Sequence, residues 1–229
     1  MLFINHFKSK IMKPESLKHL QKMHSMCSED MGYFKELIEA IIRIESETKT
    51  KSKFKIWDYV SDDYLRPAMC HVYHDNGFKV ASDSHILVAV KEDYDPSLEG
   101  RLMLKNGTLA PENEYRYPRW RDVIPNTELM EMVSVKIDFD KLKGFEADFK
   151  AKMKAADRKY ATTAVRVTEN CWFKLEYLVK LAKVMAHIGT DTLMVNADGR
   201  RAALASTDYG KAILMPTLGY EDAEFRYKL

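Results

Sequence analysis

The residues Cys70, His71 and His74 lie close together in the sequence, and their side chains are types that bind zinc. On a strand, however, side chains three positions apart point to opposite faces of the sheet, so His71 and His74 would not converge on one ion. No second group with ligand spacing follows in the sequence. The spacing therefore argues against a metal site, and we expect none.

Asp83, Ser84 and His85 are the residue types of a hydrolytic triad, but they occupy consecutive positions. Neighbours in a turn seldom reach the geometry that a nucleophile and its base require. A turn between two strands explains them better, with the Asp83 carboxylate accepting hydrogen bonds from nearby backbone. The sequence has no glycine-rich phosphate loop and no zincin or kinase motif. We therefore expect no catalytic residues and no cofactor; an enzyme built on Asp83 and His85 is the alternative.

The elements that would position these residues occur twice in the chain. Residues 54–91 and 173–218 each open with Phe-Lys and a segment of helical spacing, and each continues with strand-like segments. Asp75-Asn76-Gly77 in the first copy and Asp198-Gly199 in the second are typical hairpin turns. Both copies predict a β-α-β-β-β unit, although Pro67 must shorten the first helix. The repeat predicts an α+β fold with antiparallel sheets and with its helices on one face.

The distribution of apolar residues divides the chain into three parts. Residues 1–52 predict a helical N-terminal extension, because apolar residues recur at helical spacing between positions 31 and 42. A stretch without any apolar residue, at 46–53, is typical of a solvated linker. Residues 53–132 then form the first unit and residues 133–229 the second.

The composition limits the class of protein. Of the 229 residues, 46% are hydrophobic and 31% are charged, which is ordinary for a folded globular protein. The three cysteines are odd in number and far apart, so we expect no disulfide framework and a reducing, cytoplasmic compartment. The apolar opening of the chain is too short and too polar for a signal sequence or a membrane span, so we expect no membrane partner.

Lysines gather on two predicted helices. Positions 140–159 have helical spacing and include Lys150 and Lys154, and a helix from about residue 176 to residue 188 places Lys180 and Lys183 away from its apolar face. Lysines on a free helix face suit sequence-independent contact with phosphates, because each contact releases a counterion. A solvated lysine face is the ordinary alternative.

Three phrases of the sequence resemble, in the same order, the bacterial sliding clamps, which are the β subunit of DNA polymerase III. The first phrase, within 65–87, combines Leu-Arg-Pro-Ala-Met, Asn-Gly and Val-Ala-Ser-Asp-Ser-His-Ile-Leu. The second is Tyr-Pro-Arg-Trp-Arg-Asp-Val-Ile-Pro at 117–125. The third joins Phe-Lys-Leu-Glu-Tyr-Leu at 173–178 to Ile-Leu-Met-Pro-Thr-Leu at 213–218. The resemblance covers residues 54–91, 115–125 and 172–218, a little under half of the chain.

The sequence also departs from the family pattern. Ser82 and Ser84 stand where the family usually has Thr and Gly, and Ile86 replaces its Arg. Chains of the family are longer and contain three domains, and the basic segment at 140–159 has no obvious counterpart in them. The familiar ring of two three-domain chains therefore does not follow from the resemblance.

The resemblance implies a DNA-clamp fold, in which helices face a central hole and sheets run around the outside. Clamps of this family are not enzymes; they encircle duplex DNA and hold client peptides in an apolar cleft. Carried over to this chain, the cleft would involve Leu178, Met215, Pro216 and Leu218. The DNA-facing side would use Lys180 and Lys183, and we add Lys150 and Lys154 as further candidates.

Two functions agree with these observations. The first is a clamp-like accessory protein of replication or repair, from a phage or another mobile element, that tethers a polymerase or another client to duplex DNA without reading its sequence. It predicts a homo-oligomeric ring, and two clamp-like units per chain would suit three chains. The second is a clamp-fold protein interaction module that keeps the peptide cleft without forming a ring or encircling DNA.

Overall fold

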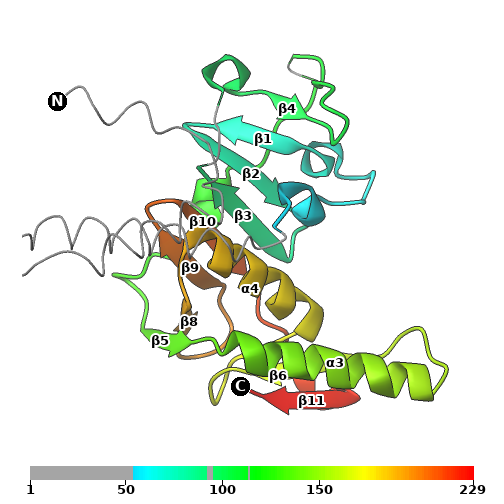
Figure 1. Ribbon diagram of the computed structural model, residues 1–229. Coiled ribbons are helices and arrows are strands. Elements are labelled where there is room, and N and C mark those ends of the chain that lie inside the picture. Colours follow the sequence, from blue (N-terminus) through cyan, green and yellow to red (C-terminus); the bar gives the residue numbers. More distant parts are fainter. Residues whose placement is uncertain (1–53, 92–94, 113) are drawn as a thin grey trace, which may run out of the picture. The chain divides into compact units, whose positions relative to one another are not determined.

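The computed structural model describes residues 54–91, 95–112 and 114–229 (Figure 1). The chain divides into two units, at residues 1–51 and 52–229, and the described residues all belong to the second. The helical extension predicted for residues 1–52 lies outside the described residues. The domain boundaries at 52/53 and 132/133 stay predictions.

Strands of both predicted units form one eight-stranded antiparallel sheet, which confirms an α+β fold and the antiparallel pairing of this sheet. The prediction fails in the smaller sheet, where the C-terminal strand at Phe225–Lys228 pairs in parallel with the strand at Thr163–Arg166. Its strand order is β4-β1-β2-β3-β10-β9-β8-β5. The bounds of these strands are β1 Val72–Asp75, β2 Phe78–Ser82, β3 Ile86–Val90, β4 Leu102–Met103, β5 Met132–Lys136, β8 Thr192–Asn196, β9 Ala203–Thr207 and β10 Gly210–Leu214.

The two halves of the sheet meet where β3 pairs with β10. The register runs from Val90 opposite Gly210 to Ile86 opposite Leu214, so every residue of the two strands is paired. Gly210 is required at this seam, because a Cβ there would lie 2.8 Å from the carbonyl oxygen of Ala89. Alternate residues of the seam face two separate apolar clusters, and this double burial explains why all five residues of β3 are buried.

The predicted hairpins are confirmed. β1 and β2 are joined at Asn76 and Gly77, whose φ angles are +49° and +78°. Two consecutive positive φ angles define the tight hairpin turn that Asn-Gly favours. In the second unit, β8 leads through the turn at Gly199 into β9, which pairs with β10.

The second unit has the predicted β-α-β-β-β order. β7 (Trp172–Phe173) leads into α4 (Leu175–Ile188), and the strands β8, β9 and β10 follow. The helix ends at Gly189, which adopts the left-handed conformation with a φ of +78°. One face of α4 packs against β9 and β10. Its buried residues have three-four spacing and are Leu175, Leu178, Leu181, Val184, Met185 and Ile188.

The helix predicted in the first unit is wrong, and so is the strand predicted at its Phe-Lys opening. Two short 3₁₀ turns, η3 (Ile56–Tyr59) and η4 (Pro67–Cys70), precede β1 instead. Pro67 starts η4, where its missing N–H costs nothing. Between the turns, the Ser61 hydroxyl accepts a hydrogen bond from the Asp63 N–H at 3.0 Å, and the Asp63 carboxylate accepts one from the Leu65 N–H at 3.0 Å. These side chains compete with the backbone bonds that an α-helix would need.

A second helix, α3 (Phe139–Ala155), and a small sheet complete the described part of the chain. α3 is capped by Asp138, whose carboxylate accepts hydrogen bonds from two backbone N–H groups of the first turn. A three-stranded sheet has the order β11-β6-β7, with β6 at Thr163–Arg166 and β11 at Phe225–Lys228. α3 packs against α4 and stacks Phe145 on Tyr227 of β11, so the two helices lie side by side (Figure 1). Neither helix of the described part is both long and apolar enough to cross a membrane.

Candidate functional site

The turn between β2 and β3 is built by its own side chains. The Asp83 Oδ1 atom accepts hydrogen bonds from the N–H groups of His85 and Ile86, both at 3.0 Å. Ser84 takes a φ of +77°, a conformation in which glycine is favoured, and this explains why the similar family usually has Gly there. The prediction of a turn held by Asp83 is confirmed. The second carboxylate oxygen of Asp83 lies 3.5 Å from Lys180 Nζ.

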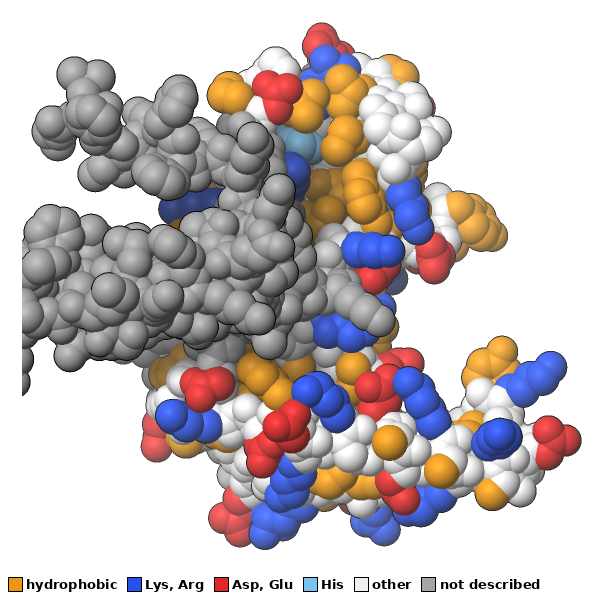
Figure 2. Space-filling model, in the orientation of Figure 1, with side chains coloured by type: hydrophobic (Ala, Val, Ile, Leu, Met, Phe, Trp, Pro, Cys, Tyr) orange, Lys and Arg blue, Asp and Glu red, His pale blue; other side chains and the backbone are white. Residues whose placement is uncertain are grey.

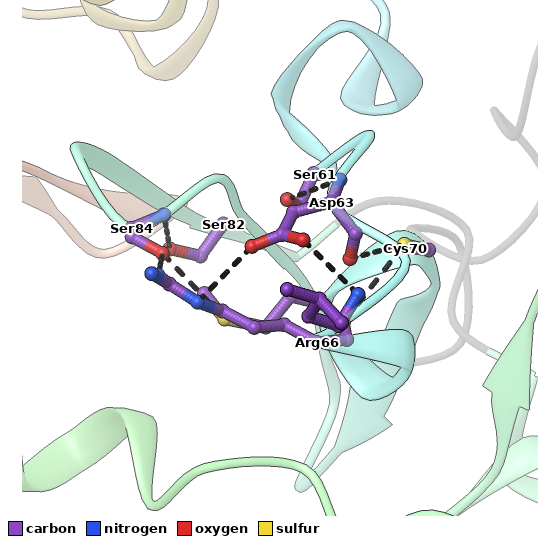
Figure 3. A network of polar contacts seen from close by, with 8 residues as sticks. Ser61, Asp63, Arg66, Cys70, Ser82 and Ser84 are labelled. Atoms are coloured by element: carbon purple, nitrogen blue, oxygen red, sulfur yellow. Dashed lines mark hydrogen bonds and ion pairs between the residues drawn. The ribbon is translucent and has the colours of Figure 1, made fainter.

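Arg66 ties this turn to η4, as Figure 3 shows. Its Nε atom lies 3.4 Å from the Asp63 carboxylate, and its guanidinium donates a hydrogen bond to the Ser84 hydroxyl. The Ser84 hydroxyl also lies 3.7 Å from the sulfur of Met69. Cys70 donates from its thiol to the carbonyl oxygen of Asp63 at 3.4 Å. The network therefore fixes Met69 beside the β2–β3 turn.

The three side chains first considered as metal ligands have separate surroundings. His71 Nδ1 lies 2.7 Å from the Pro67 carbonyl oxygen, and Cys70 belongs to the Arg66 network. His74 is fully buried on β1, where burial lowers the pKa of its imidazole and Lys79 lowers it further. Within the described residues, no three His, Cys, Asp or Glu side chains come together as metal ligands would.

Three segments that are distant in the sequence meet around one small apolar cleft of about 160 Å³. They are residues 82–87 around the β2–β3 turn, the segment 117–123, and the end of β10 at 213–215, and Met69 of η4 adds a further lining side chain. We call this hollow the apolar cleft. Its lining residues are Met69, Ser82, Ser84, His85, Leu87, Tyr117, Pro118, Trp120, Val123, Ile213 and Met215.

The apolar cleft keeps two hydrophobic side chains in contact with solvent. Val123 is 53% exposed and Met215 is 47% exposed. Exposing apolar side chains costs free energy, so a ligand that covered Val123 and Met215 would gain from burying them.

One wall of the apolar cleft is fixed from behind by Asp75. Trp120 begins η6 (Trp120–Val123), and its indole N–H donates to the Asp75 carboxylate at 2.6 Å. Arg121 forms an ion pair with the same carboxylate, and its guanidinium lies 4.3 Å from the Trp120 ring centre. Tyr117 stacks on Tyr73 of β1 with ring centres 4.9 Å apart. These contacts position Tyr117 and Trp120 in the wall of the apolar cleft.

The four residues predicted for a client cleft lie in different surroundings. Met215 lines the apolar cleft. Leu218 is exposed and lines a different hollow, and Pro216 is partly buried between them in the chain. Leu178 has no exposed surface and belongs to the core beneath α4. Side chains alternate between the two faces of the sheet at the end of β10, so Ile213 and Met215 line the apolar cleft and Leu214 belongs to the core.

Sequence reasoning missed most of the lining residues, although the signal was present. All of them fall within the three phrases quoted for the resemblance, at 65–87, 117–125 and 213–218. What the sequence did not show was that the three phrases line the same cleft.

Three of the four predicted DNA-binding lysines line a hollow between α3 and α4. Lys150, Lys180 and Lys183 are joined there by Lys174, and the hollow measures about 490 Å³. We call it the interhelical hollow. Lys154 is exposed one turn beyond Lys150 on α3 and is not part of the lining.

The charges of this helix face are mixed. Lys150 pairs with Glu146 at 2.5 Å, and Lys180 lies 3.5 Å from the Asp83 carboxylate. Within the described residues, Lys154 and Lys183 have no ion-pair partner. Along α3 the positive and negative side chains are interspersed (Figure 2). The hydrogen bond from Lys152 is the main cause that lowers the pKa of the Asp148 carboxyl, so this helix carries its own counterions.

Comparisons with known proteins identify the fold. No model of a protein family matches the chain, and no curated protein matches it. Among solved structures, the DNA polymerase III subunit β of Pseudomonas aeruginosa matches with a TM-score of 0.51 and 13% identity, over 75% of this chain and 65% of that chain. The β subunit from DNA polymerase of Streptococcus pyogenes matches with a TM-score of 0.49 and 13% identity, over 75% of this chain and 64% of that chain.

The described part of the chain therefore has a sliding-clamp fold. The particular clamp that it resembles is the β subunit of bacterial DNA polymerase III, as the three phrases predicted. The chain spans slightly less than two thirds of the length of the Pseudomonas aeruginosa subunit.

Proposed function

We propose that this protein is a clamp-like accessory factor of DNA replication or repair, which tethers a client protein to duplex DNA and catalyses no reaction. The main support is the convergence of the three clamp-like phrases on the apolar cleft. The apolar cleft would hold an apolar side chain of the client, with Val123 and Met215 at its mouth. The interhelical hollow would face DNA through its lysines.

Met215→Asp is expected to weaken peptide binding by about tenfold or more, because an apolar ligand would bury a carboxylate without a partner. The ligand is a peptide selected on the full chain from a displayed library of random sequences, and its Kd is measured by calorimetry. Leu218→Asp is the matched control, since Leu218 is exposed but lies outside the apolar cleft. Equal losses in the two variants, or a library from which no peptide is enriched, would contradict the peptide-cleft function.

Lys154→Glu with Lys183→Glu is expected to weaken binding to a duplex of mixed sequence and to reduce its salt dependence. Each phosphate contact contributes about 0.9 to the slope of log K against log salt, so losing two contacts should lower that slope by nearly two. The measurement is fluorescence anisotropy over a salt series. Arg200→Glu with Arg201→Glu, in the β8–β9 turn, reverses two exposed charges elsewhere and should leave the slope unchanged.

A ring is the further expectation of this proposal. Light scattering during size-exclusion chromatography should show a homo-oligomer, and a strict monomer without duplex binding at low salt would overturn the tethering function.

The second candidate is a clamp-fold interaction module that binds a client without binding DNA. The ion pairs of Lys150 and Lys180 and the internal pairs of α3 favour it, because they reduce the positive charge available to phosphates. Peptide binding that depends on Met215, with no duplex binding even at low salt, is the result expected of this module.

A further inference from the structure

A second hollow shares a wall with the apolar cleft. Tyr117, Pro118 and Trp120 line both, and the second hollow measures about 650 Å³. Its rim carries Arg116, Arg119 and Arg121 from the same segment of the chain. We call it the arginine hollow. The shared wall makes the two hollows neighbours.

The arginine hollow presents positive charge that the described residues do not neutralise. Arg116 and Arg119 are exposed, and neither has an ion-pair partner within the part of the chain that the structure describes. Asp75 lies in the lining, but its carboxylate is already engaged by Arg121 and by the Trp120 N–H. The other carboxylate of the lining, Asp122, is exposed. With Asp75 engaged by Arg121, Asp122 alone does not balance the charges of Arg116 and Arg119.

We propose that the client peptide carries acidic residues beside the apolar side chain that enters the apolar cleft, and that their carboxylates bind Arg116 and Arg119. This inference rests on the proposed function of the cleft. Guanidinium groups bind carboxylates through two parallel hydrogen bonds, and at the rim of an apolar site they select partners of opposite charge. The site therefore recognises an apolar residue flanked by Asp or Glu.

The two aromatic side chains that the arginine hollow shares with the apolar cleft argue for a peptide over a single nucleic-acid strand. Strand-binding proteins stack bases on open aromatic faces. Here Trp120 is 3% exposed and Tyr117 is 8% exposed, and each is already covered by another side chain, Trp120 by Arg121 and Tyr117 by Tyr73. The lining of the neighbouring apolar cleft contains no lysine or arginine that could pair with a phosphate.

The test compares peptides selected on three forms of the full chain from a displayed library of random twelve-residue sequences. The forms are the wild type, Arg116→Glu with Arg119→Glu, and the control Arg200→Glu with Arg201→Glu. We expect Asp and Glu beside apolar residues in peptides selected on the wild type and on the control. On the Arg116 and Arg119 variant we expect Lys or Arg at those positions, with the apolar residues retained.

Affinities give the second readout. The peptide selected on the wild type should bind the Arg116 and Arg119 variant roughly tenfold more weakly, and Arg116→Lys with Arg119→Lys should recover part of this loss because it keeps the charge. Unchanged melting temperatures confirm that the variants fold.

The outcomes separate the two hypotheses. Peptides that depend on Met215 but show no acidic preference overturn the acidic-client inference and leave the cleft function standing. If no peptide is enriched on the wild type, the cleft function fails first. A single-stranded oligonucleotide that binds the wild type and not the arginine variant, without acidic enrichment of peptides, would assign the arginine hollow to nucleic acid.

Discussion

We expect Gly199→Ala to lower the free energy of unfolding by at least about 3 kcal/mol. Chemical denaturation of the full chain measures this loss. Gly199 has a φ of +69°, which costs an alanine roughly 1 kcal/mol. A Cβ atom there would also lie 1.9 Å from the carbonyl oxygen of Asn170 and 2.5 Å from its carbonyl carbon. Both are backbone atoms, so the β8–β9 turn and the segment before β7 must separate.

Gly107→Ala is the matched control for this prediction. Gly107 has a φ of +85°, but a Cβ atom there would meet no atom of a non-adjacent residue within 4 Å. Gly107→Ala should therefore lower the free energy of unfolding only by the cost of placing alanine at a positive φ, about 1 kcal/mol. Similar losses at Gly107 and Gly199 would show that the approach of Asn170 to the turn is not as close as described.

Leu178→Ala is expected to lower the free energy of unfolding by about 2–5 kcal/mol, because Leu178 has no exposed surface and its truncation leaves a cavity under α4. Leu218→Ala should change it by less than about 0.5 kcal/mol, since Leu218 is 73% exposed. Urea denaturation of both variants measures the difference.

Peptide binding by the same two variants tests whether Leu178 has any direct role in a client site. Under conditions in which both variants are folded, neither should change the Kd of a peptide that occupies the apolar cleft. A Leu178→Ala variant that folds with wild-type stability would contradict the placement of this side chain in the core.

The elements that were predicted correctly are those with a local cause. Asn76-Gly77 supplies two positive φ angles in succession, and this alone specifies the first hairpin. The apolar spacing of residues 175–188 specifies α4 and its buried face. The helix of the first unit failed because Ser61, Asp63 and Pro67 act locally against it, and of these only Pro67 was weighed from the sequence.

The candidate site was predictable in its parts but not as a whole. Met215 was identified because it lies in a clamp-like phrase, and it does line the apolar cleft. Leu178 and Leu218 were grouped with it, yet they occupy the core and the interhelical hollow. Their separation depends on how the chain turns after Leu214 and on which face of α4 meets the sheet. The turn after Leu214 is set by tertiary packing, whereas the burial of Leu178 follows the apolar spacing of α4 and could have separated it from Met215.

The seam between β3 and β10 has a consequence for synthesis of the chain on the ribosome. β3 is buried throughout, but its partner at the seam begins only at Gly210, close to the C-terminus. Until β10 emerges, the strand Ile86–Val90 is an unprotected apolar edge of the kind that pairs with other chains. Nascent chains that stall before residue 210 should therefore be prone to aggregate, and chaperones that shield strand edges should matter more here than in a protein whose neighbouring strands are synthesised together.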